Sequence, residues 1–202
     1  MNLSSNSYRY FRLLVLIGVI LALCVVVLGA YVRLTDAGLG CPDWPGCYGT
    51  LTVPQSEAAI AKAQSAFPQS AVVVGKAWRE MAHRYLAGTL GLIVLAIFVL
   101  GWQAKREIKC SPWTPSFLLI LITFQAMLGM WTVTMLLKPA VVSAHLLGGM
   151  STLAILTWFA HRHWGHYSAN IVKSSRLRFA IRFALLILFM QIFLGGWTST
   201  NY

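Results

Sequence analysis

Five apolar stretches, each of about 20 residues, constrain this 202-residue chain more than any other feature of its sequence. At 1.5 Å of rise per residue, about 20 helical residues cross the roughly 30 Å hydrocarbon core of a bilayer. The sequence therefore predicts an all-α polytopic membrane protein with five membrane-spanning helices. Their expected ranges are 13–32, 79 or 81 to 102, 117–137, 141–160 and 181–198.

Composition and charge narrow the class further. Apolar residues make up 58% of the chain and charged residues 10%, which is not the composition of a water-soluble domain. The formal net charge is +11, but the basic residues cluster beside the apolar stretches instead of along one polar face. Such clusters are topology signals, whereas nucleic-acid-binding proteins gather basic residues on one surface. We expect the lipid bilayer as a partner and no nucleic acid.

The distribution of Lys and Arg predicts the orientation. Ten fall on the side of the N-terminus: Arg9, Arg12, Lys105, Arg106, Lys109, Arg162, Lys173, Arg176, Arg178 and Arg182. Five fall on the other side, which includes the long loop 33–79: Arg33, Lys62, Lys76, Arg79 and Lys138. Basic residues are enriched in cytoplasmic loops. We therefore expect a cytoplasmic N-terminus, and in a Gram-negative bacterium a multi-pass protein of the cell inner membrane with loop 33–79 in the periplasm.

Short repeated motifs divide the chain into related pieces. The first, third and fifth stretches end in similar segments, 28–32, 128–132 and 194–198, and Gln125 and Gln191 precede the last two at the same offset. The second and fourth stretches share Ala82-His83 and Ala144-His145. Any one glycine in these segments is explained by close helix packing. The repeated Ala-His pair instead predicts a duplicated hairpin that forms a four-helix bundle over residues 1–160. A cytoplasmic loop, 161–180, then leads to a fifth helix, 181–202.

His83 and His145 are the main candidates for chemistry. Each lies about four residues, or about 6 Å, inside the outer end of a span that runs in the same direction, so their depths match. A lone histidine in a membrane helix is equally compatible with a structural or pore-lining role. Two histidines at one level of a bundle are typical axial ligands of a haem iron. Zinc would need further ligands at that depth, and the sequence offers none.

Glu80 precedes His83 by three residues and shares its helical face. One interpretation is an interfacial carboxylate paired with Arg79, Arg84 or Lys76, and the other is a proton-transfer group beside the haem. Four basic side chains near the outer boundary are candidates for pairing with haem propionates: Arg33, Arg79, Arg84 and Lys138.

The roles of the cysteines and histidines outside the spans are more ambiguous. Cys41 and Cys47 flank a short segment with two prolines in the outer loop, which favours a structural disulfide, with a redox-active dithiol as the alternative. His161, His163 and His166 are expected to form a solvated face at the inner boundary.

The segment from Leu28 to Gly49, joined to Glu80-Met81-Ala82-His83-Arg84 and to Ala144-His145, resembles the haem A synthase family of cytochrome oxidase assembly proteins. That family oxidises a methyl group of haem O to the formyl group of haem A, through an alcohol, for haem-copper oxidases. The resemblance implies that His83 and His145 are axial ligands, that Glu80 is the catalytic acid, and that Cys41 and Cys47 are the outer-loop pair. It also implies haem B as a cofactor in the family, and haem O synthase and oxidase assembly factors as partners.

The sequence departs from the family pattern after its fifth stretch. The family usually has eight spans and a second histidine pair, which this chain lacks. We expect its companion to be a missing second half, another copy of the chain or a partner chain. Two other functions remain open: a bis-histidine membrane cytochrome that carries electrons, and a non-catalytic haem-handling assembly factor.

Overall fold

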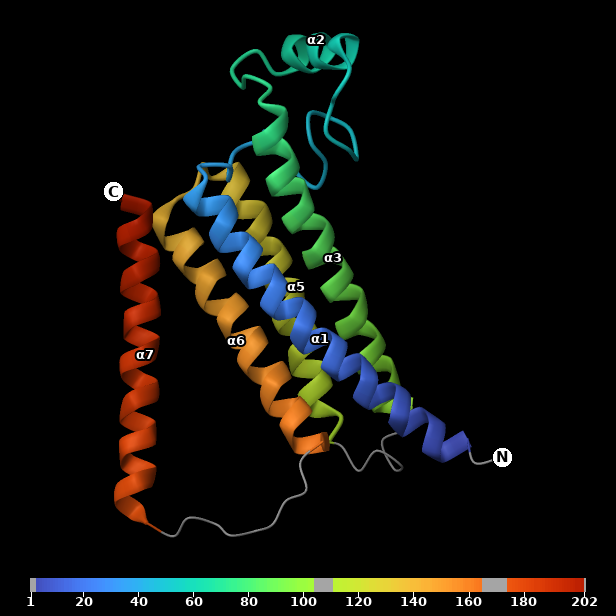
Figure 1. The fold of residues 1–202 in the computed structure, drawn as a ribbon, viewed down its shortest axis with the longest axis vertical. Coiled ribbons are helices and arrows are strands. Elements are labelled where there is room, and N and C mark those ends of the chain that lie inside the picture. Colours follow the sequence, from blue (N-terminus) through green and yellow to red (C-terminus); the bar gives the residue numbers. More distant parts are fainter. Residues whose placement is uncertain (1–2, 104–110, 165–173, 202) are drawn as a thin grey trace.

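The structure is a computed structural model that describes residues 3–103, 111–164 and 174–201 (Figure 1). Its helices are α1 (Leu3–Leu34), α2 (Glu57–Ala66), α3 (Val74–Gln103), α5 (Trp113–Thr134), α6 (Pro139–Trp164) and α7 (Ser175–Asn201). Within those ranges all of them except α2 are long and apolar enough to cross a membrane. The prediction of an all-α polytopic membrane protein is confirmed.

Four of the long helices form a bundle. Around it, α1 packs on α3, α3 on α5, α5 on α6, and α6 on α1 (Figure 1). Across the described residues α3 and α6 share no packing contact, so they occupy diagonal positions. The residues of a diagonal pair therefore face each other across the bundle interior, which is where cofactors of helical bundles are held.

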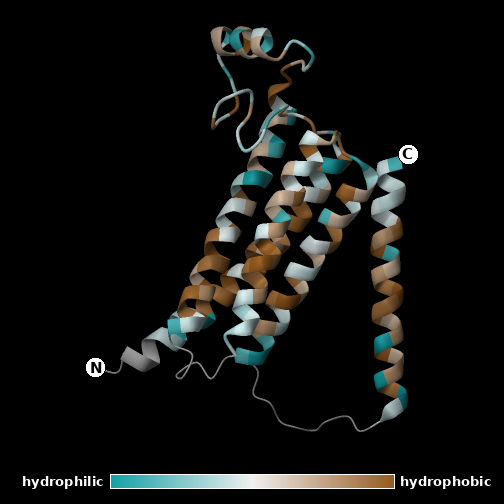
Figure 2. Cartoon of the chain, turned by 180° about the vertical axis from the view of Figure 1, so that it is seen from behind, coloured by the Kyte–Doolittle hydropathy of each residue, from teal (hydrophilic) through white to brown (hydrophobic). Residues whose placement is uncertain are grey.

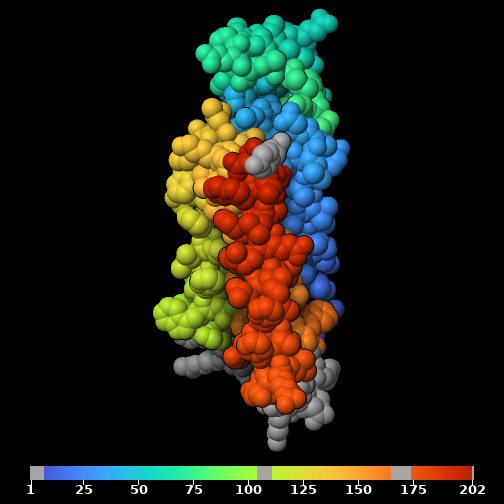
Figure 3. Space-filling model, turned by 90° about the vertical axis from the view of Figure 1, so that its left-hand side faces the viewer, coloured from blue at the N-terminus to red at the C-terminus, as the bar shows by residue number. Residues whose placement is uncertain are grey.

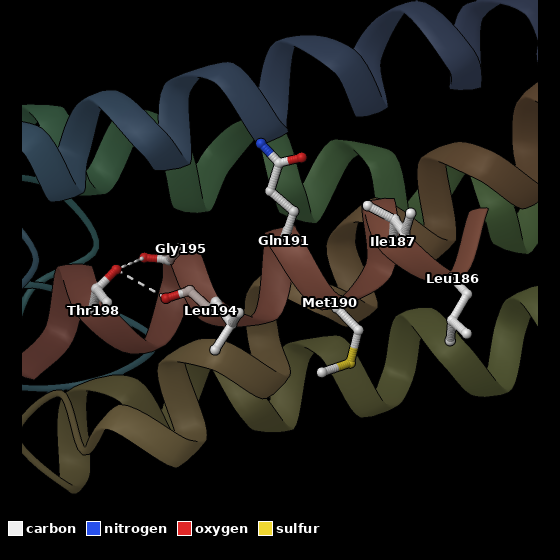
Figure 4. Close-up of a pocket in the computed structure, with 7 residues that line it drawn as sticks. All are labelled: Leu186, Ile187, Met190, Gln191, Leu194, Gly195 and Thr198. Carbon is white, nitrogen blue, oxygen red and sulfur yellow. Dashed lines mark hydrogen bonds between the residues drawn. The ribbon is translucent and has the colours of Figure 1, made fainter. Parts of the chain in front are cut away.

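The fifth long helix, α7, packs on α6, and its Ser199 carbonyl accepts a hydrogen bond from Arg33 of α1. It lies along the outside of the bundle (Figure 3). Its contact includes Gly196, where a Cβ would lie 3.0 Å from the Leu146 side chain. An open groove runs along α7, and Met190, Gln191 and Leu194 are among the residues that line it (Figure 4).

Hydrophobic residues occur along all the long helices (Figure 2). Fully buried side chains fill the half of the bundle away from the loop: Phe11, Val15, Val94, Ile97, Leu118, Leu156 and Phe159. Large apolar side chains such as Leu92 and Ile120 are exposed on its outer surface, as lipid requires. Four polar side chains are buried in the described structure: Glu80, Gln125, Ser143 and Thr152.

Residues 35–73 form a cap on one end of the bundle, here called the loop end. Their buried side chains, including Tyr48 and Val53, pack against Ala77 and Met81 of α3. The Asp43 carboxylate accepts hydrogen bonds from the backbone N–H groups of Tyr48 (2.6 Å) and Gly49 (2.7 Å), which fixes the turn. The cap is therefore an ordered structure built onto the start of α3.

The short helix α2 belongs to the cap. Ser56 is its N-cap, and the Ser56 hydroxyl accepts a hydrogen bond from the Ala59 N–H. The sequence places the start of the third span, α5, at residue 117. The helix instead begins at Trp113, because a proline in the first turn removes only an N–H group that has no helical partner.

The predicted end of the third span, at residue 137, is wrong by three residues. The helix α5 ends at Thr134, and residues 135–138 form the turn to α6. Leu136 and Leu137 adopt positive φ angles of 52° and 56°, which helices exclude. Leu136 is 76% exposed at the membrane boundary, so hydropathy alone gave no sign of the turn.

Some predictions concern positions outside the described residues. These are the basic cluster Lys105, Arg106 and Lys109, the loop residues His166 and Lys173, and the terminal Tyr202. The orientation of the chain in the membrane stays a prediction.

Candidate functional site

His83 and His145 lie on the diagonal helices α3 and α6 and turn their rings toward the neighbouring glycines. A Cβ built on Gly29 of α1 would lie 2.9 Å from His83 Cε1, and one built on Gly129 of α5 would lie 3.5 Å from His145 Cε1. The two imidazoles are close enough to interact electrostatically. Both Nδ1 atoms are buried without a hydrogen-bond partner in the described structure. The matching depth predicted from the sequence thus coincides with one shared site.

The repeated glycines have a specific role here. Gly29 and Gly129 occupy equivalent places in the sequence repeat, and each leaves room for one imidazole. One turn earlier, Val25 of α1 lies beside His83 and Gln125 of α5 lies beside His145. Close helix packing alone therefore does not explain these two glycines. In the sequence, the repeated Leu-Gly and Ala-His pairs were the signal for this role of the glycines.

Glu80 is 4% exposed and is held from two sides. Its Oε1 accepts a hydrogen bond at 2.5 Å from a terminal nitrogen of Arg84, and its Oε2 accepts one at 2.9 Å from the Cys41 N–H. Of the three cations considered for Glu80, the structure selects Arg84. Lys76 pairs instead with Asp36 at 2.7 Å.

Arg84 connects Glu80 to the cap. Its other terminal nitrogen donates to the backbone carbonyls of Asp43 (2.9 Å) and Pro45 (3.4 Å) and to that of Gly46. Both terminal nitrogens of Arg84 therefore already have protein acceptors. The side chain predicted to bind a haem propionate is engaged here in holding the loop.

The other predicted anion-binding residues differ in their surroundings. The Arg79 guanidinium carbon lies 5.9 Å from the centre of the Tyr31 ring, and no hydrogen bond to Arg79 occurs within the described ranges. Arg33 donates to the Ser199 carbonyl of α7, and its Nε is buried without a described partner. Lys138 is exposed in the turn between α5 and α6. Arg79 is the basic side chain near the site that keeps its hydrogen-bonding groups uncommitted.

Cys41 and Cys47 form a disulfide with their Cα atoms 4.8 Å apart. Both residues are fully buried against α3. Because the Cys41 N–H binds Glu80 directly, the disulfide loop and the candidate catalytic carboxylate form one unit. Sequence reasoning treated them as separate features, since 39 residues separate them in the chain.

Two ionisable groups of the cap have shifted pKa values. Burial raises the pKa of Tyr48, and the negative charges of Glu80 and Asp43 raise it further. The hydrogen bond from Lys76 and its positive charge lower the pKa of the exposed Asp36 carboxyl. The Glu80 charge is therefore felt within the cap as well as within the bundle.

His163 does not belong to a solvated face, and that prediction is wrong for this residue. Its ring packs edge-on against Phe159 (4.9 Å), Phe11 (5.3 Å) and Tyr8 (6.2 Å) at the end of the bundle away from the cap. Aromatic packing between α1 and α6 explains its position. His161 is exposed, as expected.

Comparison with known proteins identifies similar sequences over nearly the whole chain. The family model described as cytochrome oxidase assembly protein matches residues 12–202. The chain is 46% identical to a haem A synthase of Shewanella oneidensis over 92% of its own length and 56% of that protein. It is 30% identical to a haem A synthase of Bradyrhizobium diazoefficiens over 95% of its length and 58% of that protein. The chain thus spans little more than half of these curated relatives, and no solved structure matches it.

Proposed function

We propose that this chain, which belongs to the family of cytochrome oxidase assembly proteins, binds haem between His83 and His145 and takes part in haem A synthesis. In this proposal haem O is the substrate, and one of its methyl groups is oxidised to the formyl group of haem A, a four-electron oxidation that requires an external electron acceptor and an oxygen atom from water or dioxygen. The observation that carries the proposal is the placement of the two imidazoles on diagonal helices, each against a glycine.

The residues of the site fit a haem group. Two imidazoles are suitable ligands for its iron, and the Nδ1 atoms of both rings are buried without a hydrogen-bond partner in the described structure. A bound haem would supply the iron and the oxidisable ring substituent. His83 and His145 would hold it, Arg79 would bind a propionate, and Glu80 would accept or donate a proton at its carboxylate oxygen. The cap excludes water from Glu80.

We also propose the cell inner membrane as the location, with the cap on the periplasmic side, because the basic residues favour the opposite side as cytoplasmic. Haem O synthase and oxidase assembly factors are proposed partners. A second half, another copy or a partner chain is the proposed neighbour of α7.

Pigment analysis tests the proposal most directly. The chain is produced in a host that makes haem O but no haem A, and the haems extracted from the purified protein and the membranes are identified. Bound haem and new haem A support the proposal. Purified protein without haem absorbance contradicts haem binding, and bound haem without haem A contradicts catalysis by this chain.

Gly29→Ala is expected to weaken haem binding by about tenfold, since overpacking costs about 1–3 kcal/mol and about 1.4 kcal/mol is a factor of ten. The added methyl would lie 2.9 Å from His83 Cε1, so the imidazole has to move. Gly129→Ala is the matched control, because its methyl meets His145 at an ordinary 3.5 Å. Haem titration of both purified variants measures the difference. Equal effects would contradict a special role of Gly29 in seating His83.

Arg84→Met is expected to speed reduction of the Cys41–Cys47 disulfide by about tenfold or more. Hydrogen bonds to a charged group contribute about 1.5–3 kcal/mol each, and this variant removes those that hold the loop. The rate is measured by mass spectrometry after treatment with a phosphine and alkylation. Arg79→Met, one turn away and without a bond to the loop in the described structure, is the control. A wild-type rate in Arg84→Met would show that other contacts hold the cap.

A further inference from the structure

One buried polar side chain has no role in the site described so far. Gln125 of α5 is 6% exposed, and its amide nitrogen Nε2 has no hydrogen-bond partner in the described structure. An unpaired buried donor costs about 1–3 kcal/mol. In a membrane bundle no bulk water lowers that cost. Such a donor indicates a partner that is not part of this chain.

The position of Gln125 places this donor near His145. Its backbone lies next to the His145 ring, and Gly129, one turn along α5, lies under the same ring. The Gln125 amide also lies against Gly148 of α6, where a Cβ would overlap it. Gly148 is three residues after His145, so the amide lies about one helical turn deeper than the imidazole, away from the cap.

The sequence repeat makes the site symmetric in backbone but not in polarity. The Val25 backbone of α1 lies beside His83, and the Gln125 backbone of α5 lies beside His145. These equivalent repeat positions carry a hydrocarbon side chain on α1 and a carboxamide on α5. Gln125 can donate a hydrogen bond, whereas Val25 at the equivalent position cannot. A ligand with an oxygen on the edge beside Gln125 is therefore bound more tightly than a ligand without one.

Gln125 differs in charge and in depth from the arginines expected to bind propionates. The guanidinium groups of Arg33 and Arg79 lie toward the loop end, on α1 and at the start of α3. Gln125 carries no charge and lies deeper in the bundle, where a neutral oxygen costs less to bury than a carboxylate. Its chemistry fits an alcohol or aldehyde oxygen.

Resting on the proposed function, we propose that Gln125 Nε2 donates a hydrogen bond to the oxygen that the reaction introduces on the haem ring, first as the alcohol and then as the formyl group. Gln125 is then a specificity-determining residue. It favours oxidised haem over haem O, which carries a methyl group in place of the formyl.

The test compares haem A and haem O bound to the purified full chain. Gln125→Met replaces the amide by an apolar side chain of similar length, and Gln125→Leu is a second variant. Each is expected to weaken haem A binding by about tenfold, the effect of about 1.4 kcal/mol, and to leave haem O binding unchanged. The formyl stretching frequency in resonance Raman spectra is expected to rise in both variants, because the carbonyl loses its donor. Gln191→Met is the control, since Gln191 holds the equivalent repeat position on α7 and is exposed.

Retained haem O binding shows that a variant is folded. Equal weakening of both haems with an unchanged formyl frequency would overturn the inference, because it would place Gln125 at a propionate or in packing alone. Unchanged haem A binding in both variants would also overturn it. If the wild-type chain binds neither haem with a bis-histidine spectrum, the proposed function itself fails, and this inference fails with it.

Discussion

Replacing His83 and His145 together by alanine is expected to abolish haem binding, with at least about a 100-fold loss of affinity, or about 2.7 kcal/mol. The two side chains lie on helices that do not touch each other in the described structure, so a ligand that bridges them depends on both. Absorption spectroscopy of the purified protein measures haem content and the low-spin spectrum typical of two imidazole ligands.

Each single variant separates ligation from folding. His83→Ala and His145→Ala are each expected to keep some haem with an altered spectrum, since one axial ligand remains. His161→Ala is the matched control, because this histidine is exposed on the same helix as His145 but at its other end. A double variant with unchanged haem content and spectrum would show that the iron is held elsewhere.

Glu80→Gln is expected to lower the conversion of haem O to haem A by about 10²–10⁴-fold, the usual contribution of a positioned acid or base. The amide oxygen of Gln still accepts the hydrogen bond from the Cys41 N–H, so the cap keeps this anchor. The carboxylate that exchanges a proton is lost. Haem A formed per bound haem is measured in the same host as above, and haem content is expected to stay at the wild-type level.

Two comparisons make this experiment decisive. Asp36→Asn is the control, because it removes an exposed carboxylate of the cap that pairs with Lys76. Glu80→Ala should also destabilise the protein, since it leaves Arg84 buried without its carboxylate partner, a loss that costs about 3–5 kcal/mol in buried pairs. Full haem A formation by Glu80→Gln would contradict the catalytic assignment of Glu80.

For the unit of Glu80, Arg84 and the disulfide loop, the sequence predicts the position of Glu80, and the structure shows which cation pairs with it. The sequence placed Glu80 on the face of His83 and at the membrane boundary, because three residues are nearly one helical turn. It left three cations as equal candidates for pairing. The folded cap decides among them, since the backbone carbonyls of residues 43, 45 and 46 hold Arg84 while Asp36 engages Lys76.

In an apolar helix, hydropathy does not always mark the residue at which the helix ends. The end of α5 could not be predicted because Leu136 and Leu137 continue the apolar run into a turn. The rotation of each helix was equally hidden, since lipid-facing and core-facing side chains are both apolar. Gln125 therefore appeared only as a repeated residue, and its buried amide became visible once α5 and α6 were packed together.

The sequence by itself determined the number of spans and the common depth of His83 and His145. Those properties depend on distance along a helix axis, which hydropathy and a fixed rise per residue define. Only the tertiary structure decided which side chains meet: Gly29 with His83, Arg84 with Glu80 and the cap, and the Gln125 amide with Gly148 near His145. These contacts depend on the rotation of each helix about its axis and on a loop that brings Cys41 next to Glu80, 39 residues later in the chain. Neither produces a periodic pattern in the sequence.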